Sequence, residues 1–215
     1  MSEKKKTTPE QEIKETPKAA PKAPKPAINI DPQYLGRLTV TLLVICVIVA
    51  GLLGIVNAIT APIIQQANWE KTMKAMAEVL EAEDYVPMED AQLPDKVSAI
   101  YTATTGGEAI GWVVEVSPNG FDGAIQMVVG VDLADCVTGV SIVNHGETPN
   151  VGTKVVEDPE VLARFEGMTI HSGEITVNKG DNKFDGVSGA TVSSKGVTSG
   201  VNMALQAVAI NRPLG

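Results

Sequence analysis

Residues 109–143 read AIGWVVEVSPNGFDGAIQMVVGVDLADCVTGVSIV, and this stretch decides the fold. It is made of valine-rich apolar runs separated by turn-forming residues such as Pro118-Asn119-Gly120. With one further run upstream, the candidate strands are 98–103, 109–116, 124–131 and 137–143. Because the runs recur about every dozen residues, they favour antiparallel pairing. We therefore expect an α+β fold with an antiparallel sheet and flanking helices over residues 85–215.

Two helices are expected after these strands. Asp158-Pro159 is typical of a helix cap followed by a proline in the first turn, and it opens EVLARFEG at 160–167. A last helix is predicted over about 194–210, because apolar residues recur there at helical spacing. Its apolar face comprises Val197, Val201, Leu205 and Val208.

A long uncharged segment precedes the strands. The nineteen residues 38–56, LTVTLLVICVIVAGLLGIV, carry no charge and include Cys46, which is a small apolar residue in this setting. A helix of this length spans about 28 Å, close to the roughly 30 Å of the hydrocarbon core. We predict a single membrane-spanning helix over 35–60. A cleaved signal peptide is the alternative, but its apolar region is normally shorter.

A helical stalk is predicted over 61–84, directly after this span. Apolar residues there follow the i, i+3, i+4, i+7 pattern of one helix face. The predicted face is Met73, Met76, Ala77 and Leu80. A stalk that packs on its own domain explains this face, and a partner-binding helix is the alternative.

Charge is distributed unevenly about the predicted span. Through Arg37 the chain has eight basic and five acidic residues, a net charge of +3, whereas the remainder has nine basic and twenty-one acidic residues, a net charge of −12. The positive-inside rule then places residues 1–34, a Lys- and Pro-rich tail that we expect to be disordered, in the cytoplasm. The main domain would lie outside the cell membrane. Its acidity excludes nucleic-acid backbone binding as a default function.

Metal binding is not expected from the residue types. Two cysteines, Cys46 and Cys136, exclude a four-cysteine zinc or iron–sulfur site, and Cys136 is predicted to be a buried thiol. His145 and His171 have no matched carboxylate cluster. The aspartates predicted to be solvated turn residues without a calcium-loop spacing are Asp122, Asp132 and Asp135.

Residues 185–195, DGVSGATVSSK, are the most informative for function. Small residues allow close approach of a ligand, and a helix N-terminus presents unpaired N–H groups that suit a phosphate. Lys195 would add a positive charge. The hydroxyl side chains here are Ser188, Thr191, Ser193 and Ser194. On residue types alone, a Gly/Ser turn with a serine helix cap is the favoured interpretation, and phosphate binding is the alternative.

The stretch DGVSGAT resembles the flavinylation motif of FMN-binding domains, in which the final threonine carries FMN through a phosphoester bond. The matching residue is Thr191. The stretches GWVVEV, FDGAIQMVVGVD and VTGVSIVNHGETPNVGTK, and the order of span and stalk, resemble the G subunit of the Rnf electron-transport complex over roughly 35–210. The C subunit of the sodium-translocating NADH:quinone reductase is a related family. The short chain and the Lys/Pro-rich tail favour the Rnf G subunit.

The resemblance implies a relay that carries covalent FMN in an ion-translocating ferredoxin:NAD⁺ oxidoreductase and has no independent active site. It implies polytopic partner subunits with flavin or iron–sulfur centres. It also implies a separate flavin transferase, using FAD and a divalent metal, that recognises Asp185 and Gly186. The residues implied to bind the cofactor are Glu147, Thr148, Gly152, Ser188, Gly189, Ala190, Ser193, Ser194 and Lys195. A membrane-tethered binding or assembly module without a redox role is the alternative from another class.

One motif departs from the family pattern. In such proteins a stretch like ETPGLG lies near the flavin, whereas residues 147–152 of this chain read ETPNVG. Asn150 and Val151 therefore stand in place of glycine and leucine. The departure leaves the local backbone conformation, and any contact by Asn150, open.

Overall fold

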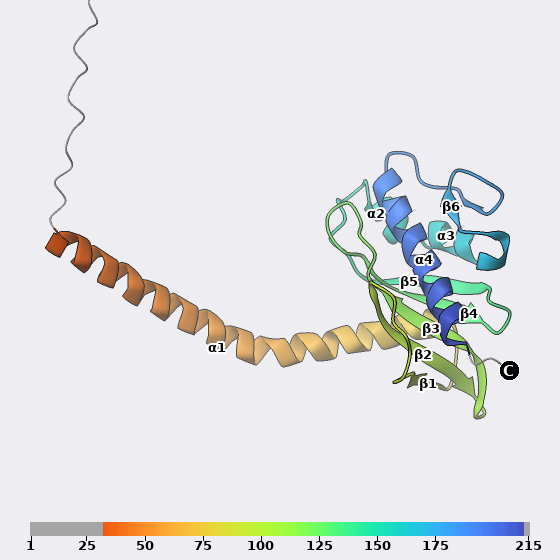
Figure 1. The fold of residues 1–215 in the computed structure, drawn as a ribbon, viewed down its shortest axis with the longest axis horizontal. Coiled ribbons are helices and arrows are strands. Elements are labelled where there is room, and N and C mark those ends of the chain that lie inside the picture. Colours follow the sequence, from red (N-terminus) through yellow and green to blue (C-terminus); the bar gives the residue numbers. More distant parts are fainter. Residues whose placement is uncertain (1–31, 213–215) are drawn as a thin grey trace, which may run out of the picture. The chain divides into compact units, whose positions relative to one another are not determined.

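The computed structural model describes residues 32–212 (Figure 1). The predicted tail therefore lies outside the described residues except for its last three positions, 32–34. The chain divides into two compact units, of which the first ends at Ile55 and the second begins at Val56.

The helix α1 (Pro32–Val79) contains the predicted span. Within Leu35–Val79, a window of 18 residues has a mean hydropathy of 2.9, so the helix is long and apolar enough to cross a membrane. The large apolar side chains of 38–55 are about half exposed or more, so the described protein does not bury them. Such a surface suits the interior of a bilayer.

The second unit is built on a five-stranded antiparallel sheet with the strand order β1-β2-β3-β4-β5. The strands are β1 (Asp84–Pro87), β2 (Val97–Thr105), β3 (Glu108–Val116), β4 (Gln126–Asp132) and β5 (Val137–Asn144). The four predicted runs correspond to β2 to β5, and strands adjacent in the sequence pair with one another. The α+β prediction is confirmed. The short edge strand β1 was not predicted.

Alternating side chains of the sheet face two different helices. Val114 and Val116 of β3 join a core that includes helix α4 (Thr191–Asn211), whereas Val113 points to the other face. Figure 1 shows α4 lying across the sheet. The apolar face predicted for the last helix is buried as expected, because all four of its residues are no more than 2% exposed.

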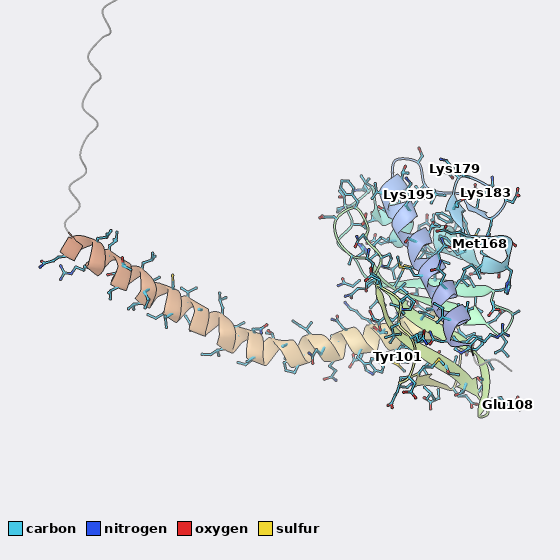
Figure 2. All side chains as sticks on the ribbon, in the orientation of Figure 1. Tyr101, Glu108, Met168, Lys179, Lys183 and Lys195 are labelled. Carbon is cyan, nitrogen blue, oxygen red and sulfur yellow. The ribbon has the colours of Figure 1, made fainter. Side chains whose placement is uncertain are left out.

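The last turns of α1 cover the opposite face of the sheet. Met76 and Val79 cluster there with Val113 and Tyr101, and Figure 2 labels Tyr101 where the end of α1 meets the sheet. The hydroxyl of Thr138 donates a hydrogen bond of 2.6 Å to the Val79 carbonyl. The predicted stalk therefore packs on its own domain.

The packing face of this helix agrees with the predicted one only in part, because Met76 is buried and Leu80 packs against the same cluster, whereas two predicted residues do not. The buried residues are Thr72, Ala75, Met76 and Val79, whereas Met73 and Ala77 are exposed. The rotation of the helix is set by two glycines of the sheet. A Cβ on Gly130 would fall 2.7 Å from the Val79 carbonyl oxygen, and a Cβ on Gly139 would fall 3.1 Å from the Val79 Cα. The backbone at Val79 thus turns toward the sheet, and the apolar pattern alone could not show this.

Short elements connect β5 to α4. They are α2 (Thr153–Val156), α3 (Pro159–Leu162), η1 (Ala163–Phe165), η2 (Ile170–Ser172) and the parallel pair β6 (Thr176–Val177) and β7 (Lys183–Phe184). The predicted cap is present, since the Asp158 side chain accepts a hydrogen bond of 3.0 Å from the Glu160 N–H. The α-helical part ends at Leu162, earlier than predicted. The rings of Phe165 and Phe184 stack with centroids 4.1 Å apart and anchor the connection to the core.

Candidate functional site

A pocket of about 350 Å³ opens at the N-terminus of α4. Its lining residues are Phe121, Glu147, Val151, Gly152, Gly189, Ala190, Thr191, Val192 and Ser193. The apolar side chains of Phe121, Val151 and Val192 remain 67%, 45% and 49% exposed. The pocket thus combines an exposed apolar rim with polar groups contributed by the helix terminus and by one carboxylate.

The first turn of α4 presents its backbone N–H groups without a side-chain cap. Ala190 occupies the N-cap position and makes no side-chain hydrogen bond, so the helix has no serine cap. Within α4, the first backbone N–H that donates to a carbonyl four residues earlier belongs to Ser194, which donates to the Ala190 carbonyl at 2.9 Å. Helix geometry leaves the N–H groups of residues 191–193 without intrahelical partners. Thr191, the first helical residue, is exposed at the pocket.

A buried carboxylate joins this helix to two loops. Glu147 is only 5% exposed. Its Oε1 accepts hydrogen bonds from the backbone N–H groups of Phe121 at 2.7 Å and Asp122 at 3.5 Å. Its Oε2 accepts a hydrogen bond of 2.5 Å from the Ser193 hydroxyl. One side chain therefore connects the loop after β3, the segment after β5 and the first turn of α4.

Two glycines give this carboxylate its space. A Cβ on Gly120 would overlap Oε1 of Glu147, and a Cβ on Gly152 would overlap Oε2 and lie 2.9 Å from the Ser193 Oγ. A side chain at either position would displace the carboxylate from its donors. Gly152 therefore contributes to the site through the absence of a side chain.

The segment 147–152 forms a turn that explains the departure from the family pattern. Asn150 has a φ of +61°, in the left-handed region that favours glycine and that asparagine tolerates better than most residues. Its N–H donates a hydrogen bond of 2.9 Å to the Thr153 hydroxyl. The Thr148 carbonyl accepts from the Gly152 N–H at 3.0 Å, and the side chain of Val151 lines the pocket. Asparagine thus preserves a turn that glycine would otherwise form.

Some of the predicted cofactor residues do not line the pocket. The Ser194 side chain is fully buried, and its Oγ accepts a hydrogen bond of 3.2 Å from the Val187 N–H. Ser188 and Lys195 are exposed outside the lining, although Lys195 lies near the start of α4 (Figure 2). Thr148 contributes its carbonyl to the turn and is likewise not a lining residue. The structure therefore brings Glu147, Gly152, Gly189, Ala190, Thr191 and Ser193 together.

The predicted recognition residues lie on the segment that leads to the helix. The carboxylate of Asp185 is 3.5 Å from the Lys183 ammonium, and its carbonyl accepts from the Arg164 guanidinium at 2.9 Å. The Gly186 N–H donates to the Asn178 side chain at 2.9 Å. These bonds hold in place the segment that leads into α4, and the Asp185 side chain remains 69% exposed.

Sequence reasoning missed the apolar rim. Phe121 lies in the turn after β3 and Val192 is the second residue of α4, and both line the pocket. The available signal at Phe121 was an aromatic residue in the otherwise small and polar turn PNGFDG. Val192 gave no such signal, because a single valine in a helix is ordinary.

The turn after β4 corrects the expectation of a solvated aspartate. Asp135 is 9% exposed, and its Oδ2 lies 2.6 Å from the Arg212 guanidinium and 3.1 Å from the His171 Nε2. A φ of +61° at Asp135 turns the side chain inward toward the end of α4.

Cys136 is half-buried rather than fully buried. Over residues 32–212 there is no group of three or more His, Cys, Asp or Glu side chains that could hold a metal ion.

Comparison with known proteins gives this pocket a context. The FMN-binding domain family matches residues 120–206, a range that contains every lining residue of the pocket. The G subunit of the Na⁺-translocating ferredoxin:NAD⁺ oxidoreductase complex of Acetobacterium woodii is 30% identical over 199 residues, which cover 85% of this chain and 95% of that relative. This chain belongs to the family of G subunits of ion-translocating oxidoreductase complexes. The G subunit of the ion-translocating oxidoreductase complex of Methanosarcina acetivorans is 28% identical over 184 residues, or 83% of this chain and 96% of that relative.

Among solved structures, the crystal structure of Shewanella oneidensis NqrC is similar to this chain with a TM-score of 0.42 and 23% identity. The match covers 54% of this chain and 65% of the NqrC chain.

The residues of the pocket fit FMN. The uncapped N–H groups of 191–193 suit a phosphate group, because a helix N-terminus carries partial positive charge. The exposed side chains of Phe121, Val151 and Val192 suit an apolar ring face. The pocket therefore combines a polar end, which suits the phosphate, with an apolar wall, which suits the ring.

Proposed function

We propose that this chain is the flavin-carrying electron relay of an ion-translocating ferredoxin:NAD⁺ oxidoreductase complex, with FMN linked covalently to Thr191. The family relationship supports the complex, since the Acetobacterium woodii relative is named as its G subunit. The FMN-binding domain supports the cofactor. The observation that carries the attachment site is the exposed Thr191 at the head of an uncapped helix and at the pocket.

The other hydroxyls of 185–195 are less suitable for attachment. The Ser193 hydroxyl is buried and donates to Glu147, and the Ser194 side chain is fully buried. Ser188 is exposed but is not a lining residue of the pocket. Thr191 alone among these four hydroxyl residues is both exposed and part of the lining. Geometry therefore supports the residue that the motif resemblance implies.

The chain's own groups would hold and orient the cofactor. A phosphodiester keeps one negative charge, which the N–H groups and the dipole of α4 stabilise without a buried cation. Phe121, Val151 and Val192 would contact the apolar part of the ring and exclude water from it. FMN supplies the redox chemistry when bound, and the protein supplies orientation and electrostatics. This division of roles suits a relay that has no substrate site of its own.

Maturation would require a separate flavin transferase. In the balanced reaction, a phosphoester bond forms at the Thr191 hydroxyl, the pyrophosphate bond of FAD breaks, and AMP and the hydroxyl proton leave. The Asp185 side chain is exposed and would be available for recognition, with Gly186 held beside it. No base within the domain is needed, because the transferase with its divalent metal would supply the activation.

The distribution of charge on the two sides of α1 supports a membrane topology. We propose that α1 spans the membrane once, with the basic N-terminal side in the cytoplasm and the acidic second unit outside. The described chain offers no dinucleotide fingerprint and no metal cluster, so the donor and acceptor centres would belong to polytopic flavin- or iron–sulfur-containing partner subunits. The relay would pass electrons one at a time between them.

The test is covalent flavin on the denatured chain. The full-length protein is produced together with its flavin transferase, denatured on a gel and viewed under ultraviolet light. The wild type and Ser188→Ala, which removes an exposed hydroxyl outside the pocket, should fluoresce, whereas Thr191→Ala should be dark. Mass analysis of the 185–195 peptide should place the added mass on Thr191. A fluorescent Thr191→Ala band would refute the attachment site, and a dark wild type would refute the relay.

A further inference from the structure

We propose that Glu147 lowers the reduction potential of the flavin in this pocket by holding an unneutralised negative charge beside it. This inference rests on the proposed function, because it concerns the electrostatics of the same pocket. Glu147 would then be a residue that sets the redox behaviour of the relay, in addition to connecting the loops that form its wall.

The hydrogen bonds of Glu147 are those of an ionised carboxylate. Oε1 accepts from two backbone N–H groups, at 2.7 Å and 3.5 Å, and backbone N–H groups can only donate. Oε2 accepts from the Ser193 hydroxyl. Each carboxylate oxygen is therefore the acceptor in every hydrogen bond that it makes. The negative charge therefore lies inside the protein, at a side chain that is 5% exposed.

No lysine, arginine or histidine forms an ion pair with the Glu147 carboxylate within the described part of the chain. The pocket lining includes no lysine, arginine or histidine. The ion pairs of the described residues involve other carboxylates. The nearby His145 accepts the Glu147 backbone N–H at its Nδ1, at 3.3 Å, and its Nε2 lies 3.4 Å from Glu157 instead. The field of Glu147 therefore acts on whatever occupies the pocket.

The position of the charge is fixed by packing. Gly120 and Gly152 approach the two carboxylate oxygens so closely that even a methyl group at either position would overlap them. Phe121, which donates to Oε1, and Ser193, which donates to Oε2, are themselves lining residues. The carboxylate thus cannot swing away when charge develops in the pocket. A fixed charge costs no reorganisation when an electron arrives, so its full effect appears in the potential.

The expected size follows from the dimensions of the pocket. A cavity of about 350 Å³ is about 9 Å across if it is nearly spherical, so a bound ring lies within about this distance of Glu147. Each electron that the flavin accepts adds negative charge unless a proton follows it. At an effective dielectric constant of about 20, typical of protein sites, repulsion across this distance changes the ratio of reduced to oxidised flavin by about twentyfold. For a one-electron step, twentyfold corresponds to about 77 mV.

The test compares two substitutions in the full-length, flavin-loaded protein. Glu147→Gln removes the charge and keeps a side chain of the same shape, whereas Ser193→Ala keeps the charge and removes one of its donors. Midpoint potentials are measured by reductive titration against indicator dyes, after the flavin content per chain has been determined. We expect Glu147→Gln to raise the one-electron potential by about 77 mV, or twentyfold. Ser193→Ala should lower it, because a carboxylate with fewer donors exerts a stronger field.

These results separate the inference from the proposed function. A wild-type protein without covalent flavin would refute the proposed function before any potential is measured. With flavin bound, an unchanged or lower potential in Glu147→Gln would overturn the role of Glu147 and leave the relay intact. If Glu147→Gln takes up no flavin, Ser193→Ala decides alone, and a potential equal to or above that of the wild type would overturn the inference. A merely structural role for Glu147 predicts no opposite shifts in the two variants.

Discussion

Replacing Gly152 with alanine should destabilise the second unit more than a single methyl group on an open surface would. The new Cβ would overlap Oε2 of Glu147 and would lie 2.8 Å from the Glu147 Cβ and 2.9 Å from the Ser193 Oγ. Glu147 and Ser193 are 5% and 2% exposed, so neither has open solvent into which it can move. The carboxylate must therefore leave its donors.

The size of the effect follows from the bonds that are lost. Displacement of Glu147 breaks its bond with the Ser193 hydroxyl and weakens its 2.7 Å bond with the Phe121 N–H. A buried polar group without its partner costs about 1–3 kcal/mol. Both Glu147 and Ser193 lose a partner, and relaxation of the loop recovers part of the combined cost. We expect Gly152→Ala to lower the free energy of unfolding by about 2–4 kcal/mol. For a domain of this size, that lowers the Tm by about 5–10 °C.

Urea unfolding of the full-length protein in detergent, followed by tryptophan fluorescence, measures this change. The matched control is Gly189→Ala, which meets nothing within 4 Å and carries only the strain of a φ of +83°, about 1–2 kcal/mol. Gly152→Ala should be the less stable of the two variants, and it should also lose bound flavin. Unfolding of Gly152→Ala within about 0.5 kcal/mol of the wild type would refute the tight packing of glycine against Glu147.

Two further predictions concern the turn after Glu147 and the sheet. Asn150→Ala should destabilise the protein by about 1 kcal/mol, whereas Asn150→Gly should not, because only the alanine strains a φ of +61°; equal unfolding midpoints would contradict this. Burial raises the pKa of Glu115 above its ordinary value of 4.5, so its ionised form is disfavoured in the folded state. Stability from this group is therefore present below its ordinary pKa and is lost as the pH rises through the raised one. Glu115→Gln should stabilise the protein at pH 7 by less than about 1 kcal/mol, since the side chain is only half-buried, and the difference should close below pH 4.5, as pH-dependent urea unfolding would show.

The sheet could be predicted because its signal is local. The valine-rich runs alternate across the sheet and end at turn residues, so both their extent and their pairing follow from the pattern. Strand β1 was missed because DYVP is short and contains a proline. The packing face of α1 was assigned only in part, because the close approach of Val79 to Gly130 and Gly139 involves residues far away in the sequence.

The site was only partly predictable for the same reason. The motif at 185–195 predicted Thr191 and Ser193, and both line the pocket because they stand in the first turn of α4. Lys195 was expected beside the phosphate, but the pocket is confined to the first turn of α4 and to the loops around it. The contribution of Phe121 depends on how the loop after β3 folds back against that turn.

The packing of α4 explains why this loop reaches the pocket. A Cβ on Gly196 would lie 2.6 Å from the Asn119 carbonyl oxygen, and a Cβ on Gly200 would lie 2.8 Å from the Pro118 side chain. The absence of side chains at these two positions, one helical turn apart, allows the loop to contact the helix backbone directly. The loop then carries the Phe121 N–H to Glu147, whose other oxygen binds Ser193 on the first turn of α4. The distance between Phe121 and Thr191 is therefore set by glycines on the buried face of α4, beyond the motif that would carry the cofactor.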